Sequence, residues 1–236
     1  MNSSFLIIII CFFAFSEIKA QNAEQYYSIA VDKALLKKYD EALLYFTKAI
    51  ELNPNYDDAY SLRAGVKNEK GNIKGALLDY DTAIKINNQN AEYFSLRAGC
   101  KNTLYDFAGA VTDYTQSLKN DSTNSTSYYN RGNSKRKLMD FRGAVADYSK
   151  SLQIDPKNKL AYYNRAKAKT ELKDFSNAIL DYNKALQIDP NYSDAYTNRG
   201  LLRINQNDKN GGCMDLSKAG ELGDKAAYEA IRNLCR

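Results

Sequence analysis

The stretch at residues 151–166, SLQIDPKNKLAYYNRA, recurs at residues 185–200 as ALQIDPNYSDAYTNRG. The second copy begins 34 residues after the first, and most of its positions carry the same or a similar residue. A fixed internal period is typical of repeat proteins, in which each repeat is one supersecondary unit packed against its neighbours. The period therefore determines how the rest of the sequence is interpreted.

The 34-residue period continues without a gap through six rows. The rows are 23–56, 57–90, 91–124, 125–158, 159–192 and 193–226. The fourth place is aromatic in every row: Tyr26, Tyr60, Phe94, Tyr128, Tyr162 and Tyr196. The eighth place is small in every row: Ala30, Ala64, Ala98, Gly132, Ala166 and Gly200. The twentieth place is Ala in the first five rows, and the twenty-fourth place is aromatic in the same five.

These columns resemble the tetratricopeptide repeat family, whose unit is a 34-residue pair of antiparallel helices. The resemblance covers residues 23–226, and it implies an all-α, right-handed solenoid of six helix-turn-helix repeats within residues 21–226. Small residues at places eight and twenty allow the two helices of a repeat to approach closely, and the aromatic residues fill the space between repeats. We expect a terminal capping helix over residues 225–236, with Ala227, Ala230, Ile231 and Leu234 at helical spacing.

Two further columns predict where the second helix of each repeat begins and ends. The sixteenth place is Asn or Asp in rows two to six, and a side-chain oxygen there can cap the second helix. These residues are Asn72, Asp106, Asp140, Asp174 and Asp208. All three prolines share one column near the end of a row, at Pro54, Pro156 and Pro190, and proline disfavours continuation of a helix.

A repeated Arg–Asp pair is expected inside each repeat from row two onward. The arginines occupy place seven, at Arg63, Arg97, Arg131, Arg165 and Arg199, and the aspartates occupy place twenty-three, at Asp79, Asp113, Asp147, Asp181 and Asp215. Row one lacks both partners together, since it has Ile29 and Tyr45 there. An arginine stripe for anionic ligands is the alternative interpretation.

In the family, place six of the first helix lines the concave binding groove, and here the last three rows form a ladder of Asn130, Asn164 and Asn198. An Asn side chain can donate to a peptide carbonyl and accept from a peptide N–H, so this ladder resembles the backbone-binding asparagines of the O-GlcNAc transferase repeats. Tyr129 and Tyr163 lie beside it at place five. The alternative is that these asparagines only solvate a polar face.

The predicted groove also differs in charge along its length. Rows two and three carry Asp58, Glu69 and Glu92, whereas rows four and five carry Arg136, Lys137 and Lys167. This difference could orient a ligand with an acidic portion, although a solvated mixed surface is the alternative. Chaperone-tail binding by the family needs three basic residues that are missing from the best-matching window here. That window retains Asn133 and Asn164, which join the candidate peptide-binding residues.

The first 20 residues predict a secretory signal peptide. The apolar run from Phe5 to Phe15 is shorter than the roughly 20 residues that span a bilayer. We expect cleavage after Ala20, with Ser16 as the alternative, and export to the periplasm or the extracellular space. The mature chain then has no stable membrane span; a cytoplasmic chain or a retained anchor is the alternative.

Composition excludes several classes of function. The chain has no His, which removes His-dependent catalysis and His-ligated metal sites, and no phosphate-binding loop or metal spacing is present. The net charge is +5, without a basic block that would track nucleic acid. We therefore predict a non-catalytic exported scaffold, without a cofactor or metal, that binds a protein or peptide partner on its concave face. A glycan or cell-wall binding module that stacks sugars on Tyr129 and Tyr163 is the alternative.

The last row suggests a disulfide. Counted from the turn at Gly223, Cys213 and Cys235 lie near the same level of an antiparallel helix pair, so we expect them to pair in an oxidising compartment. Cys100 should remain a free buried thiol, because no other row has a cysteine in its column. Three separate buried thiols are the alternative.

Overall fold

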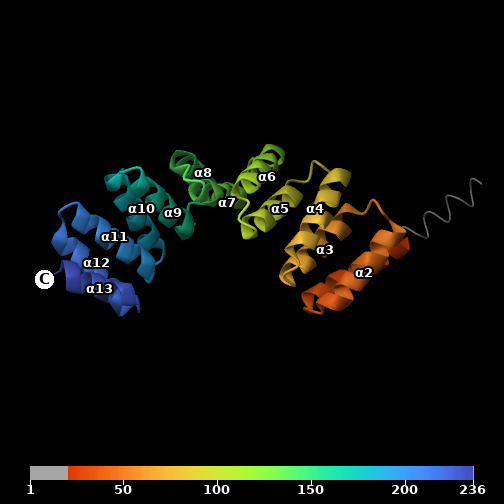
Figure 1. Cartoon of the computed structure of the whole chain (residues 1–236), viewed down its shortest axis with the longest axis horizontal. Coiled ribbons are helices and arrows are strands. Elements are labelled where there is room, and N and C mark those ends of the chain that lie inside the picture. The colour runs from red at the N-terminus through yellow and green to blue at the C-terminus, as the bar shows by residue number, and fades with distance from the viewer. Residues whose placement is uncertain (1–20, 236) are drawn as a thin grey trace, which may run out of the picture. The chain divides into compact units, whose positions relative to one another are not determined.

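The computed structural model describes residues 21–235, so the predicted signal peptide over residues 1–20 lies outside the described part of the chain. Residues 21–35 are helical, and no strand occurs within residues 21–235 (Figure 1). The expected all-α class is therefore confirmed.

Helices alternate with short turns at the period seen in the sequence. The helices that open rows two to six, and the terminal helix, are α3 (Asp57–Glu69), α5 (Ala91–Thr103), α7 (Ser125–Lys137), α9 (Lys159–Glu171), α11 (Ser193–Asn205) and α13 (Lys225–Leu234). The second helices of the six rows are α2 (Tyr39–Leu52), α4 (Ile73–Ile86), α6 (Phe107–Asn120), α8 (Phe141–Ile154), α10 (Phe175–Ile188) and α12 (Lys209–Glu221).

The described chain divides into two compact units, residues 21–121 and residues 122–235. Within the first unit α3 packs against α4 and α5 against α6, and within the second unit α7 packs against α8, α9 against α10 and α11 against α12. In each unit, consecutive helix pairs also contact each other, as α4 does α5 and α8 does α9 (Figure 1). Each unit is thus a stretch of helical repeat solenoid, in which consecutive helix pairs bury their apolar faces against each other.

The small and aromatic columns form the core. The alanines at places eight and twenty, such as Ala64 and Ala76, are fully buried, and so are the aromatic rings at place twenty-four. Row four has Gly132 at place eight because a Cβ there would lie 2.8 Å from the Tyr148 ring. In row six a Cβ on Gly212 would lie 2.6 Å from the Gly200 carbonyl oxygen, so α11 and α12 approach more closely than a side chain allows.

The predicted caps form on four of the five second helices. Asn72, Asp106, Asp140 and Asp208 each accept a hydrogen bond from the backbone N–H three residues later, at 2.9 Å. The prediction is wrong for Asp174, which makes no bond to the helix backbone. Its carboxylate instead accepts from the Asn177 side-chain amide, at 2.9 and 3.1 Å.

The helices that precede a proline end where expected, but α4 and α6 end at the equivalent Ile86 and Asn120 without one, so proline is not required for the stop. The helices α2, α8 and α10 stop at Leu52, Ile154 and Ile188, two residues before Pro54, Pro156 and Pro190. The turn between the two helices of a repeat needs a left-handed backbone instead. Place fifteen has a positive φ in every row, from 57° at Lys37 to 79° at Gly71, and only row two uses glycine there.

The Arg–Asp pairs are confirmed, and each aspartate has a second cation. Arg165 binds Asp181 through Nε and Nη2, at 2.9 and 2.6 Å, and Lys169 Nζ lies 2.7 Å from the same carboxylate. The other rows repeat this triad with Lys67, Lys101, Lys135 and Arg203. Each arginine also lies over the aromatic ring at place four of its own row, at 5.4–5.6 Å.

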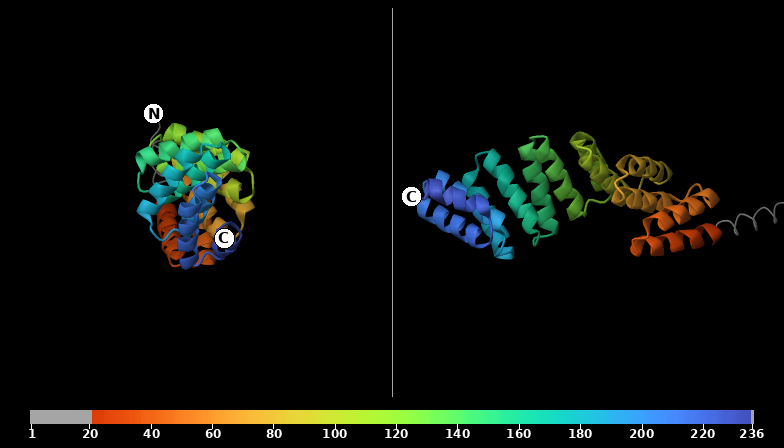
Figure 2. Two further views of the ribbon diagram at one scale, coloured as in Figure 1. Left: turned by 90° about the vertical axis from the view of Figure 1, so that its left-hand side faces the viewer. Right: turned by 60° about the horizontal axis from the view of Figure 1, so that its bottom comes forward.

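The terminal helix α13 packs against α12 at the end of the second unit (Figure 2). Ala227 is fully buried against Leu216 and Ala219, and Ile231 packs against the same cluster. Leu234, which we expected among the covering residues, is 39% exposed. The helix therefore covers the apolar end of α12 mainly through its first two turns.

Candidate functional site

The predicted groove residues gather on one face of the second unit. On α7, Tyr129, Asn133 and Arg136 follow one another at helical spacing, and on α9 Tyr163 and Lys167 do the same. Asn130, Asn164 and Asn198 occupy equivalent positions on α7, α9 and α11. The helix α7 contacts α9, and the pair α9–α10 contacts α11. These side chains therefore belong to one continuous surface, which we call the first-helix face.

The amide groups of Asn164 and Asn198 each donate a hydrogen bond to the preceding repeat. Asn164 Nδ2 donates to Tyr129 Oη at 3.0 Å and to Asn133 Oδ1 at 3.3 Å. Asn198 Nδ2 donates to Tyr163 Oη at 3.1 Å and to the Asp194 carbonyl at 2.7 Å. Both hydrogens of each amide are therefore used within the protein. In the described chain no donor binds the side-chain oxygen of Asn164 or Asn198, so these two residues offer acceptors to a ligand.

The groove tyrosines are packed into the wall of the repeats. The Tyr163 ring lies 4.9 Å from the Tyr192 ring and 5.9 Å from the Tyr182 ring, and the Tyr129 ring lies 5.9 Å from that of Tyr148. Burial raises the pKa of Tyr163, with a further contribution from Asp194. Lys167 Nζ lies over the Tyr163 ring at 5.4 Å. Their hydroxyls accept hydrogen bonds from the ladder asparagines, and the Tyr163 ring also contacts the lysine.

Beneath the ladder, Tyr148 links α8 to α7. Its hydroxyl donates to Asn133 Oδ1 at 2.8 Å, and burial raises the pKa of Tyr148 to about 12. Asn133 therefore receives one hydrogen bond from Tyr148 and one from Asn164. The two asparagines that the sequence singled out in this window are joined through this network.

Arg136, Lys137 and Lys167 form a cationic cluster on the same face. Burial lowers the pKa of Lys167, and the nearby Arg136 and Lys137 lower it further, while Asp194 and Glu171 oppose this shift. Within the described chain, none of the three cations forms an ion pair. The Arg136 Nε atom is buried and has no hydrogen-bond acceptor. The structure therefore brings the three predicted basic residues together.

A small pocket beside the ladder was not predicted. It has a volume of about 300 Å³ and is lined by Phe175 and Tyr182 from α10 and by Asn198 and Asn205 from α11. The first unit has an apolar pocket of about 280 Å³ at equivalent places, lined by Tyr39, Phe46, Leu62 and Glu69. Both pockets lie where one row packs against the next, and residues at the same places of the repeat line them. The repeat period could therefore have predicted their positions.

The acidic residues predicted for the groove lie in the first unit. Glu69 lines the apolar pocket there, while Asp58 accepts a hydrogen bond of 2.5 Å from the Tyr93 hydroxyl. Tyr93 also donates to Asp57, at 3.0 Å. The expected orientation of a ligand by both groups of charges stays a prediction.

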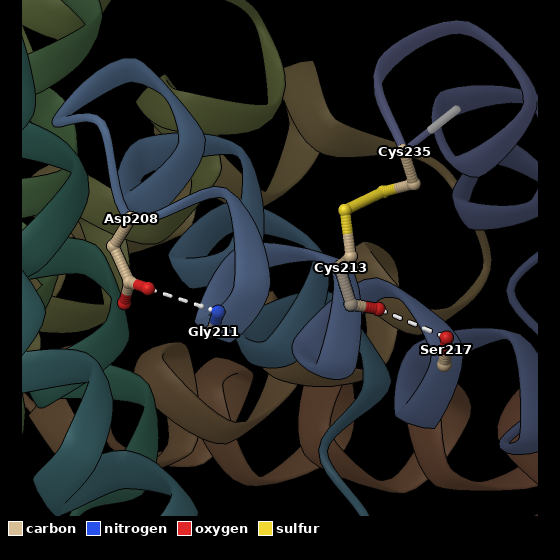
Figure 3. The surroundings of a disulfide bond; sticks show 5 residues. All are labelled: Asp208, Gly211, Cys213, Ser217 and Cys235. Carbon is tan, nitrogen blue, oxygen red and sulfur yellow. Dashed lines mark hydrogen bonds between the residues drawn. A yellow bond between two sulfur atoms is a disulfide. The ribbon is translucent and has the colours of Figure 1, made fainter.

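A disulfide joins Cys213 on α12 to Cys235 at the end of α13, with their Cα atoms 5.8 Å apart (Figure 3). The alternative of three separate thiols does not describe this structure. Cys100 is free and buried. Near the disulfide, the Asp208 cap binds the Gly211 N–H, and the Cys213 carbonyl accepts from Ser217 (Figure 3).

Within residues 21–235, no group of three or more acidic, cysteine or histidine side chains is placed to hold a metal ion. Within this range, no helix has both the length and the hydropathy needed to cross a bilayer.

Comparison with protein families identifies the repeat. A family model described as a tetratricopeptide repeat matches residues 23–56, 125–158 and 160–192, and a second model of the same description matches residues 181–212. Together the matches span about half of the chain. A search of curated proteins found no match.

Solved structures share the fold at low sequence identity. YrrB, described as a TPR protein with an unusual peptide-binding site, has a TM-score of 0.72 and 19% identity, covering 80% of this chain and 98% of its own. PilF of Pseudomonas aeruginosa has a TM-score of 0.76 and 16% identity, covering 91% and 98%. A C-terminal part of a TPR repeat-containing protein from Cytophaga hutchinsonii has a TM-score of 0.75 and 18% identity, covering 94% and 93%. At these identities the likeness concerns the fold alone.

Proposed function

Because this chain belongs to the tetratricopeptide repeat family, whose members generally act as scaffolds for protein–protein interaction, we propose that it is a non-catalytic scaffold that binds an extended peptide segment of a partner. The binding surface is the first-helix face of the second unit. The fold shared with YrrB, whose description includes a peptide-binding site, supports the use of such repeats for peptides.

The observation that carries this proposal is the orientation of the ladder amides. Asn164 and Asn198 donate both amide hydrogens to the protein, which fixes the side chains and leaves each Oδ1 acceptor without a donor in the described chain. A peptide in extended conformation has backbone N–H groups that need acceptors when they leave water. Acceptors held one repeat apart therefore suit the backbone of a peptide, independently of its side chains.

The same geometry makes glycan binding the weaker candidate. Sugar rings stack on open aromatic faces, but the Tyr163 ring has two tyrosine neighbours and a lysine within 6 Å of its centre. Tyr129 and Tyr163 also hold the ladder through their hydroxyls. Their position is better explained by support of the asparagines than by stacking.

The test uses the chain from residue 21 onward and a peptide selected from a random display library. Changing Asn130, Asn164 and Asn198 together to Ala should weaken binding at least tenfold in calorimetry, while the helical circular dichroism stays unchanged. The matched control changes the exposed Asn191, Asn210 and Asn233 to Ala and should leave the affinity within twofold.

A further arm sharpens this test. Methylation of the peptide backbone nitrogens that face the ladder should abolish binding. If the Ala variant binds as tightly as the unchanged chain, the ladder is not the binding element and the proposal fails.

We also propose that the protein is exported to the periplasm or the extracellular space. The short apolar run from Phe5 to Phe15 supports this, and so does the Cys213–Cys235 disulfide, because disulfides persist mainly in oxidising compartments. Mass spectrometry of the non-reduced protein from its source should find a chain that begins near residue 21, with one thiol that reacts after denaturation. A full-length chain with only free thiols would contradict export.

A further inference from the structure

The three cations of the first-helix face differ from the other basic residues around them. On α7 and α9, Arg131, Lys135, Arg165 and Lys169 all bind buried aspartates of α8 and α10. Arg136, Lys137 and Lys167 have no such partner within the described residues. Asp194 and Glu171 lie near Lys167, but neither is close enough to form an ion pair with it. The face therefore carries positive charge that the repeat itself does not neutralise.

Burial makes this lack of a partner costly. The Arg136 Nε atom is shielded from water and has no acceptor, and an unsatisfied buried donor costs on the order of 1–3 kcal/mol. Lys167 is partly buried next to Arg136, and both effects disfavour its charged form. An anion bound between these two side chains would satisfy the guanidinium and stabilise the ammonium group.

The position of the cluster in the repeat indicates what kind of group it receives. Between rows five and six, places 12, 17 and 24 of one row and places 6, 9, 10 and 13 of the next line the neutral pocket beside Asn198. The same places between rows four and five are Arg136, Phe141, Tyr148, Asn164, Lys167, Ala168 and Glu171. A seam that is neutral in one row pair thus carries two cations and one acid in the adjacent pair, and Lys137 adds a third cation beside it.

We propose that Arg136 and Lys167, with Lys137 at the rim, bind a carboxylate side chain of the peptide that lies on the asparagine ladder. The partner is then an acidic peptide, with Asp or Glu at the row four to row five seam and an uncharged residue at the next seam. This inference rests on the proposed peptide-binding function. Arg136 supplies the planar pair of donors that matches a carboxylate, and Lys167 supplies a second charge from the neighbouring helix.

The first experiment repeats the library selection with two chains. Peptides selected on the unchanged chain should be enriched in Asp and Glu at one position, and an Arg136→Gln, Lys167→Gln variant should lose that enrichment. If the selected peptides depend on the ladder but show no acidic position, the carboxylate site is refuted while the peptide-binding function stands. If no selected peptide depends on the ladder, the proposed function itself has failed, and the inference fails with it.

The second experiment measures the charge preference directly. An acidic peptide from the selection should bind at least tenfold more weakly to the Arg136→Gln, Lys167→Gln variant at physiological salt. The control Lys157→Gln, Lys184→Gln removes the same charge from exposed positions and should change the affinity less than twofold. A similar loss in both variants would show only a general electrostatic attraction and would overturn the site.

Two further measurements define the ligand group. Replacing the acidic residue of the peptide by its amide should reproduce the loss, whereas replacing it by phosphoserine should not improve binding tenfold. A large gain with phosphoserine would assign the site to phosphate instead of carboxylate. In NMR of the chain with methylated lysines, the pKa of Lys167 should rise when the acidic peptide binds, and an unchanged value would place the peptide elsewhere.

Discussion

At the scale of single residues, the helix caps depend on a glycine three positions later. A Cβ on Gly109 or Gly143 would lie 2.1 Å from an oxygen of the capping aspartate, so a larger residue there requires the cap to move. Row five has Asn177 at this place, and Asp174 does lose its bond to the helix backbone. The cap therefore requires both an Asn or Asp at place sixteen and a glycine at place nineteen.

This dependence predicts unequal effects of one substitution in neighbouring repeats. Asp140→Ala should lower the free energy of unfolding by about 1 kcal/mol, because it removes a bonded cap. Asp174→Ala should cost clearly less, since it removes only the contact with the Asn177 side chain. Both positions lie in the second unit, so urea unfolding followed by circular dichroism compares them within one compact body.

A double-mutant cycle provides the control. In an Asn177→Gly background the Asp174 carboxylate should regain the backbone N–H, and Asp174→Ala should then cost about as much as Asp140→Ala. Equal costs of Asp174→Ala with and without Asn177 would show that glycine has no part in the cap.

At the scale of helices, buried charge triads join the two helices of rows two to six, and in rows two, three, five and six the arginine also binds the preceding row. Arg165 binds Asp181 of its own row and donates from Nη1 to Ser149 Oγ on the preceding α8, at 3.0 Å. Arg63 and Arg97 make the equivalent bonds to Thr47 and Asp81 in the first unit. Such a network specifies the register of adjacent helices more than it stabilises them, because burial of the charges offsets much of their attraction.

The sequence predicted part of this network for a physical reason. The Arg–Asp pair was recognisable because row one lacks both partners at once. The second cation at place eleven was missed, although that column is basic in all six rows, because Lys33 of row one stays and binds Glu41 instead. The partners on the preceding helix could not be predicted from a column, since Thr47, Asp81, Ser149 and Asn183 share only a polar oxygen.

The candidate site was likewise predictable from the sequence only in part. The period was sufficient to place the asparagines and the three cations on the first helices. The direction of the amides was not predictable, because it depends on tyrosine hydroxyls 35 residues earlier in the chain. The lack of an acceptor for Arg136 Nε likewise depends on packing among α7, α8 and α9, which no single column encodes.

At the scale of the whole molecule, both units contain the same buried tyrosine column. Burial raises the pKa of Tyr114 in the first unit and of Tyr148 in the second to about 12, from an ordinary value of 10.0. Burial also raises the pKa of Tyr80 and Tyr182. Since the column contributes one such ring to each of these repeats, the effect of alkaline pH should be distributed along the chain.

The sign of the pH effect follows from proton binding. Above pH 10 the unfolded chain loses tyrosine protons that the folded chain retains, so the unfolded state binds fewer protons and stability falls as pH rises. The contribution of Tyr148 is fully present below pH 10 and is lost between pH 10 and about 12, at up to ~1.4 kcal/mol per pH unit. We therefore expect urea midpoints that change little between pH 7 and 9 and fall steeply above pH 10.

Substitution separates the tyrosines from the lysines that titrate in the same range. Tyr148→Phe should lower stability at pH 8 by about 1 kcal/mol, because Asn133 loses a hydrogen bond, but it should also make the decline between pH 10 and 11 shallower. Tyr105→Phe, at a site that is 82% exposed, serves as the control and should leave the decline unchanged. If Tyr148→Phe declines as steeply as the unchanged chain, the buried tyrosines do not limit alkaline stability.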